Sequence, residues 1–153
     1  MKITERFRSC AKTAGRAHYI FIGLLTAQFL TGLSMILTGA FSNVGLVILP
    51  FIGMVIGLLM FGSVAYIGFK LARSGLEFQE IIVAGAAYGL LMGVLPSIFF
   101  VLVFLSPGSP FSDSPPTLTT LITVMFIPLN LFFGTFWGLG LALVGGIAGR
   151  NRP

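Results

Sequence analysis

The chain has 153 residues, which allows one domain, and 56% of its residues are hydrophobic whereas 8% are charged. Because a soluble domain carries about 25% charged residues, this composition excludes a soluble globular protein and predicts a membrane protein. The formal net charge of +5 does not indicate nucleic-acid binding, since its carriers are divided among short segments that flank apolar runs, and we expect no nucleic-acid partner.

Residues 1–18 form a basic segment that we expect at the cytoplasmic face of the membrane. Ile3, Phe7, Ala11 and Ala14 lie near one helical face, which predicts a short amphipathic helix in the bilayer interface. The only cysteine, Cys10, cannot form an internal disulfide. We interpret it as a small interfacial residue, with palmitoylation as the alternative.

The only histidine, His18, ends this segment beside Tyr19. One imidazole does not make a metal site, and no acidic residue lies nearby in the sequence. We therefore expect an interfacial anchor at His18 rather than a ligand of a metal or a haem.

Two apolar runs follow, at residues 19–41 and 44–69, separated by Ser42 and Asn43. Each run is long enough to cross a hydrocarbon core of about 30 Å as an α-helix. A turn this short makes the two spans antiparallel neighbours.

The connection at residues 70–80 carries the next group of charges. Ser74 and Glu77 have the spacing of a capping box, which predicts a helix that begins near Gly75. Glu77 and Glu80 would then lie in its first turn, where negative charge is favourable for the helix dipole.

The remaining apolar runs cover residues 81–105 and 118–149, and residues 150–153 form a tail. The proline-rich loop at residues 106–117 between them is expected outside the cell. Ser114 as N-cap and Pro115 as the first helical residue are predicted to start the last helix.

The basic residues predict the topology. We expect all nine to lie on the cytoplasmic side, so that both termini are cytoplasmic and the protein lies in the plasma or inner membrane. Their expected partners are anionic lipid headgroups. The predicted headgroup contacts are Lys2, Arg6, Arg8, Lys12, Arg16, Lys70, Arg73, Arg150 and Arg152.

Glycines spaced four residues apart predict how the helices pack. Such glycines form a flat strip on a helix, which lets another helix backbone approach closely. Two hypotheses account for these strips: packing within the chain, and contact with other subunits. The predicted packing positions are Gly53, Gly57, Gly85, Gly89, Gly93, Gly134, Gly138, Gly145 and Gly149.

Polar side chains are sparse within the spans. Gln28 and Asn130 fall near the membrane midplane, and an unpaired amide is costly there, so each is expected to have a hydrogen-bond partner. For Asn130 the preferred acceptor is the carbonyl of residue 124, which Pro128 leaves free. Trp137 also lies well inside its span, where its indole N–H requires an acceptor and indicates contact with protein.

The sequence therefore predicts an all-α integral membrane four-helix bundle, with no catalytic residue, cofactor or metal site. The leading hypothesis is a non-enzymatic structural or accessory subunit that packs against copies of itself or other membrane subunits. The alternative is a small oligomeric channel or facilitator for an ion or neutral solute. Its lining would comprise Gln28, Asn130, Thr31, Ser34 and Thr38.

Overall fold

In a computed structural model, the described residues 3–37, 45–105 and 115–151 form five α-helices. Four of these helices are long and apolar enough to cross a membrane, which confirms the prediction of an all-α fold with four long apolar helices. The helices are α1 (Ile3–Ala14), α2 (Arg16–Leu37), α3 (Gly45–Arg73), α4 (Phe78–Leu105) and α5 (Pro116–Arg150).

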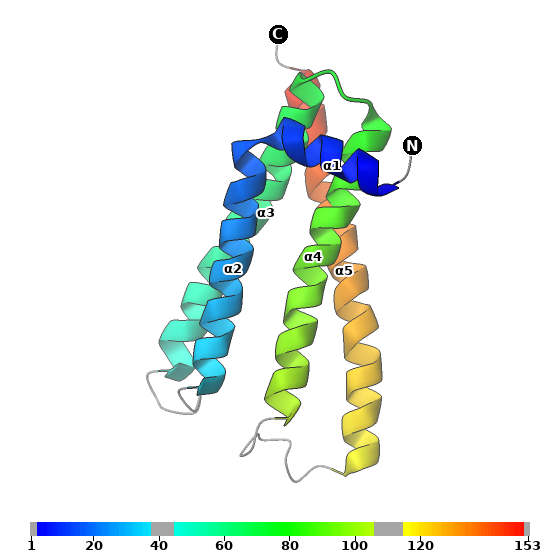
Figure 1. The fold of residues 1–153 in the computed structure, drawn as a ribbon. Coiled ribbons are helices and arrows are strands. Elements are labelled where there is room, and N and C mark those ends of the chain that lie inside the picture. The colour runs from blue at the N-terminus through cyan, green and yellow to red at the C-terminus, as the bar shows by residue number, and fades with distance from the viewer. Residues whose placement is uncertain (1–2, 38–44, 106–114, 152–153) are drawn as a thin grey trace.

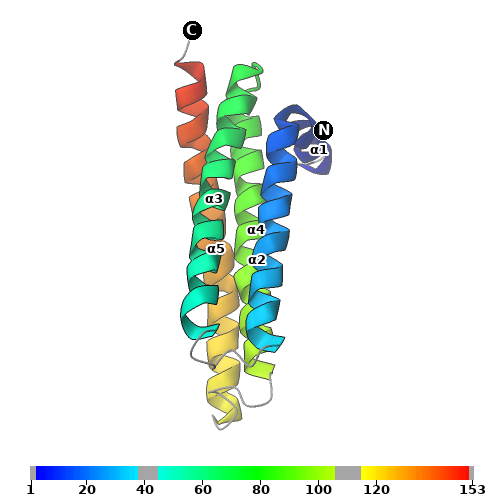
Figure 2. The same ribbon diagram turned by 90° about the vertical axis from the view of Figure 1, so that its left-hand side faces the viewer.

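The four long helices run alternately up and down, so that the first and last described residues lie at the same end of the bundle (Figure 1). We call this the basic end; it contains α1, the connection between α3 and α4, and the last turns of α5. Here α1 crosses the bundle at a steep angle to the long helices (Figures 1 and 2). α5 packs along both α4 and α3, and α2 packs mainly on α3.

The connection between α3 and α4 differs from the predicted capping box. α3 continues to Arg73 and ends in a Schellman motif, in which Gly75 at φ 81° and Leu76 donate their N–H groups to the carbonyls of Ala72 and Leu71. α4 begins at Phe78, and the Glu80 carboxylate accepts the N–H of Glu77 at 3.1 Å. Glu77 is therefore the N-cap rather than a first-turn residue. The expected start near Gly75 was wrong because that glycine ends the preceding helix.

α5 also begins later than predicted. Its N-cap is Pro115, without a side-chain cap, and Pro116 is the first helical residue. α5 then runs through Pro128 for 35 residues, about 52 Å, which exceeds a hydrocarbon core of about 30 Å. The predicted cap at Ser114, the turn at Ser42 and Asn43, and most of the 106–117 loop lie outside the described residues.

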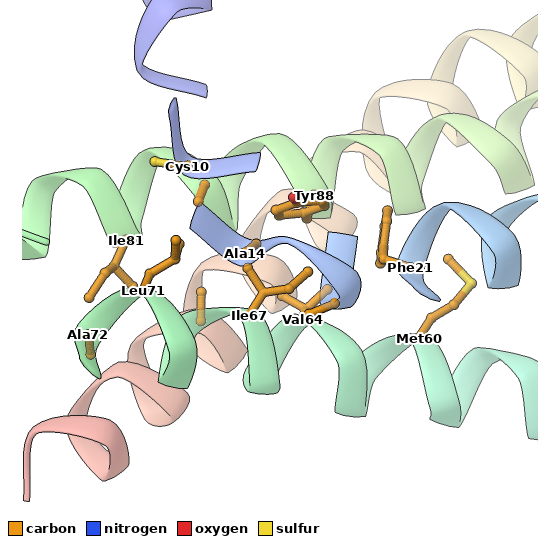
Figure 3. Packing of buried hydrophobic residues seen from close by; sticks show 13 residues of the cluster. Cys10, Ala14, Phe21, Met60, Val64, Ile67, Leu71, Ala72, Ile81 and Tyr88 are labelled. Carbon is orange, nitrogen blue, oxygen red and sulfur yellow. The ribbon is translucent and has the colours of Figure 1, made fainter. Parts of the chain in front are cut away.

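The most deeply buried side chains gather at the basic end, between α1, α2, α3 and α4 (Figure 3). Large apolar side chains are exposed along the rest of the bundle, including Phe51 on α3 and Phe132 on α5. A water-facing surface of this kind would be unfavourable, whereas lipid tails solvate it readily. The largest fully buried side chains are Tyr88, Phe21, Ile67, Leu71, Ile81, Val64 and Cys10.

Candidate functional site at the basic end

The short helix α1 is docked on the bundle through its small residues. Cys10 and Ala14 are fully buried, and Phe7 packs against the same cluster. The Cys10 thiol points to the backbone carbonyl oxygen of Glu80 at 3.6 Å. Lys70 donates from Nζ to the carbonyl oxygen of Ala14 at 3.3 Å, where a cation is favourable for the negative end of the α1 dipole. Protein rather than headgroups thus covers this face of α1.

The Cys10 thiol has low reactivity in this position. Burial raises the pKa of its thiol, and the nearby Glu80 carboxylate raises it further. A protonated thiol is a weak nucleophile and a weak metal ligand. Its burial also removes it from the surface at which palmitoylation takes place. In the described part of the chain, no three His, Cys, Asp or Glu side chains are grouped so that they could hold a metal ion.

His18 pairs with a residue that the sequence did not single out. Its Nδ1 atom lies 2.8 Å from the hydroxyl of Tyr88 on α4. Tyr88 is fully buried, and its ring makes edge contacts with Phe7 and Phe21, at centroid distances of 5.5 and 4.8 Å. One hydrogen bond and a set of rings therefore join α1, α2 and α4. His18 connects helices here, a role beyond the interfacial anchor that was expected.

Three of the predicted headgroup residues that the structure describes contact the protein itself. Lys70 caps α1, as described above. Arg150 donates from its guanidinium to the carbonyl oxygen of Leu76 at 3.1 Å and lies 4.4 Å from the ring centroid of Phe78. Arg73 lies above the ring of Phe69 at 5.8 Å. Of the others, Arg8, Lys12 and Arg16 are exposed and Arg6 is partly so, while Lys2 and Arg152 lie outside the described residues.

Glycines of α4 and α5 face each other along the bundle. A Cβ atom at Gly89 would meet the carbonyl oxygen of Gly134 and would lie 2.9 Å from the Cα of Gly138. A Cβ at Gly85 would lie 2.8 Å from the carbonyl oxygen of Gly138, and one at Gly93 would lie 2.5 Å from that of Asn130. The two backbones thus touch directly, and any side chain on this strip would separate them.

The other predicted glycines divide into two groups. Gly145 and Gly149 lie against the backbone of α3, where added Cβ atoms would meet the carbonyl oxygens of Ala65 and Phe69. Gly57 has nothing within 4 Å, and Gly53 is near only the Gln28 amide nitrogen, at 3.5 Å. The structure therefore gives this last pair no backbone contact. Gly68 also lies against the backbone of Ala142, although it has no glycine four residues away and was not predicted as a packing position.

The polar residues of the spans bond mostly within their own helices. The Asn130 amide donates to the carbonyl oxygen of Phe126 at 2.9 Å, not to that of residue 124, because an asparagine on a helix reaches one turn back and residue 124 lies further away. Thr31 and Ser34 donate to the carbonyls of Ala27 and Leu30, each at 2.9 Å. The predicted Thr38 lies outside the described residues.

Gln28 differs from these residues. Its Oε1 atom is buried and accepts no hydrogen bond from any described residue. Its amide nitrogen faces Gly53 on α3, whereas the Asn130 backbone lies against Gly93 on α4. The two residues thus lie at different helix interfaces.

Comparisons with known proteins identify no similar protein. The chain matches no family model, no curated protein and no solved structure, so its function has to be inferred from the arrangement of its own residues.

Proposed function

We propose that this chain is a non-enzymatic multi-pass membrane protein that acts by packing against other membrane subunits, either copies of itself or different proteins. In this proposal the basic end faces the cytoplasm, both termini lie there, and anionic headgroups surround it. Cys10, His18 and Tyr88 then have a structural role, because their thiol, imidazole and phenol are occupied in joining α1, α2 and α4.

The observation that carries the proposal is the exposed aromatic surface of α5. Phe132, Phe136 and Trp137 are 65%, 61% and 54% exposed. Trp137 lies 13 residues before Arg150, about 20 Å along the helix. If Arg150 marks the cytoplasmic boundary, Trp137 lies deep inside a core of about 30 Å, away from the headgroups that usually hold tryptophan.

The indole N–H at this depth requires an acceptor. Among the described residues none accepts a hydrogen bond from the Trp137 indole, and the aromatic rings near it are those of Phe61 and Phe136, at centroid distances of 6.3 Å each. Lipid tails cannot supply an acceptor, whereas a carbonyl or hydroxyl on a neighbouring helix can. We therefore assign the α5 surface to a partner helix.

The channel hypothesis has less support. A lining group needs free donors or acceptors that converge on one path. The hydroxyls of Thr31 and Ser34 and the amide of Asn130 donate within their own helices. Gln28 and Asn130 lie at different helix contacts.

Purification from native membranes in a mild detergent tests the proposal. Wild-type protein carrying two different tags, expressed together, should co-purify as a homo-oligomer or bring a second membrane subunit in a fixed ratio. Trp137→Leu and Phe136→Leu should weaken that association. Phe51→Leu, which changes an aromatic side chain that is 62% exposed on α3, is the matched control and should leave association unchanged.

Two results would overturn the assignment. One is a monomeric wild-type protein without a partner, both in mild detergent and after cross-linking in intact membranes. The other is equal loss of association in the α5 and α3 variants, which would indicate a general effect of surface apolarity rather than a specific contact.

A further inference from the structure

A groove runs along the outer surface between α2 and α3, separate from the aromatic surface of α5. Its volume is about 380 Å³. Since the two helices are antiparallel, the groove begins toward the basic end at Ala17 and Tyr66 and continues toward Leu24. Its walls include Ala17, Ile20, Leu24, Leu59, Gly62 and Tyr66.

The groove is suited to an apolar occupant. Its buried polar residue, Ser63, already donates its hydroxyl to the carbonyl oxygen of Met60 at 2.7 Å, so an occupant need not supply a hydrogen bond there. Its surface is open at Gly62, where an added Cβ would meet nothing within 4 Å.

The length of the groove distinguishes an acyl chain from a helix. From Ala17 to Leu24 the groove extends about 10 Å along α2. A transmembrane helix would lie along the full core of about 30 Å, so most of its contact would fall outside the groove. One lipid chain occupies such a short apolar depression without burying any polar group.

Positive charge lies at one end of the groove only. Arg16 directly precedes Ala17 and is exposed, and its guanidinium makes no ion pair or hydrogen bond with any described residue. The Tyr66 ring, on the opposite wall, stacks on Phe69 at 6.3 Å, and the Arg73 guanidinium lies above that same Phe69 ring at 5.8 Å. The apolar groove thus leads to a cationic and aromatic surface, the pattern that an anionic headgroup with its chain requires.

We propose that the groove between α2 and α3 binds one acyl chain of an anionic phospholipid, whose phosphate lies beside Arg16 and Tyr66 at the basic end. This site does not depend on the partner assigned to α5. The lipid would fill the depression and hold α2 against α3, the two helices that form its walls.

Two glycines of α3 provide a matched pair of variants. Gly62→Leu places a side chain in the groove, whereas Gly57→Leu places the same side chain on the same helix outside it, and added Cβ atoms meet nothing within 4 Å at either position. Both variants are therefore expected to fold, which circular dichroism and size-exclusion chromatography verify. A third variant, Arg16→Gln, removes the charge and leaves the groove intact.

The measurement is native mass spectrometry of the purified protein with equal amounts of phosphatidylglycerol and phosphatidylcholine that carry identical chains. Wild-type protein and Gly57→Leu should retain one phosphatidylglycerol in preference to phosphatidylcholine. Gly62→Leu should lower retention of both lipids by about tenfold, as expected when contacts of about two methylene groups are lost. Arg16→Gln should lower only the preference for phosphatidylglycerol, by about fivefold.

Three outcomes would overturn the proposal. Equal lipid retention in the two glycine variants would show that the groove holds no chain. An unchanged lipid preference in Arg16→Gln would remove the headgroup assignment. A dimer that disappears in Gly62→Leu, with lipid retention unchanged, would assign the groove to a second copy of the chain.

Discussion

Replacing Gly89 by alanine tests the direct backbone contact between α4 and α5. The added Cβ would meet the carbonyl oxygen of Gly134 and would lie 2.9 Å from the Cα of Gly138 and 3.0 Å from the carbonyl carbon of Gly134, where ordinary contacts are 3.4–4 Å. Backbone atoms cannot rotate away as a flexible side chain can. The two helices must therefore separate by about 0.5–1 Å to relieve the overlap.

The separation has a cost that extends beyond the substituted residue. A radial gap of about 0.5–1 Å removes about a quarter to a half of each dispersion contact across an interface. Overpacking of this kind destabilises by about 1–3 kcal/mol, while alanine regains up to about 1 kcal/mol of helix propensity. We expect Gly89→Ala to lower the free energy of unfolding by about 2 kcal/mol relative to Gly57→Ala, whose Cβ enters open space.

Unfolding in mixed micelles with increasing sodium dodecyl sulfate measures this difference. The single tryptophan, Trp137, directly precedes Gly138 on α5 and reports separation of the helices through its fluorescence. Circular dichroism follows the loss of helix in the same samples. Equal unfolding midpoints for Gly89→Ala and Gly57→Ala would refute the argument, because they would mean that α4 and α5 do not approach closely at Gly89.

Four further predictions address the orientation and the basic end. In a Cys10→Ala background, a membrane-impermeant maleimide should label Thr117→Cys from outside intact cells and should not label Asn151→Cys, since both positions are exposed but lie at opposite ends of α5; the reverse pattern would contradict the proposed orientation. Tyr88→Phe removes the bond to His18 and should destabilise by about 1 kcal/mol in the same unfolding assay, whereas an unchanged midpoint would show that the bond does not stabilise the cluster. In detergent at neutral pH, Cys10 should react with maleimide far more slowly than the exposed thiol of Asn151→Cys, because burial raises its pKa. Rapid labelling of the folded protein would contradict the burial of Cys10. Since the folded state holds the thiol proton of Cys10 more tightly than the unfolded state does, the contribution of Cys10 to the free energy of unfolding should fall as the pH rises above about 8.5.

The four long helices could be predicted because the signal is local. Runs without charged residues that exceed the thickness of a bilayer have few alternatives to a transmembrane helix. The ends of the helices were harder to predict than their existence, as the segment from Ser74 to Glu80 illustrates. Serine and glutamate at 74 and 77 have capping spacing, but so do the N–H of Glu77 and the carboxylate of Glu80. The φ of 81° at Gly75 decides between these alternatives, and the sequence does not specify it.

Contacts between helices could not be derived, because periodicity identifies a face and not its partner. Gly85, Gly89 and Gly93 mark a small face, but only the structure assigns that face to α5. Gly53 and Gly57 have the same spacing without a backbone contact. The bond between His18 and Tyr88 joins residues 70 positions apart. The sequence contains one signal that could have indicated this bond: Tyr88 lies within an apolar run, and the hydroxyl of a tyrosine there needs a hydrogen-bond partner.

The basic residues link the orientation of the chain to its packing. Lys70 closes the end of α1 and Arg150 binds the connection before α4, so two charges that favour the cytoplasmic side also hold protein segments together. Both acceptors are backbone carbonyls, which an uncharged side chain of similar length would satisfy less well. Arg8 and Lys12 are exposed on α1 and are free to attract anionic headgroups while α1 is docked. We therefore propose two roles for the charges at the basic end: the exposed residues would attach α1 to the bilayer surface, while the hydrogen-bonded residues hold segments of the protein together.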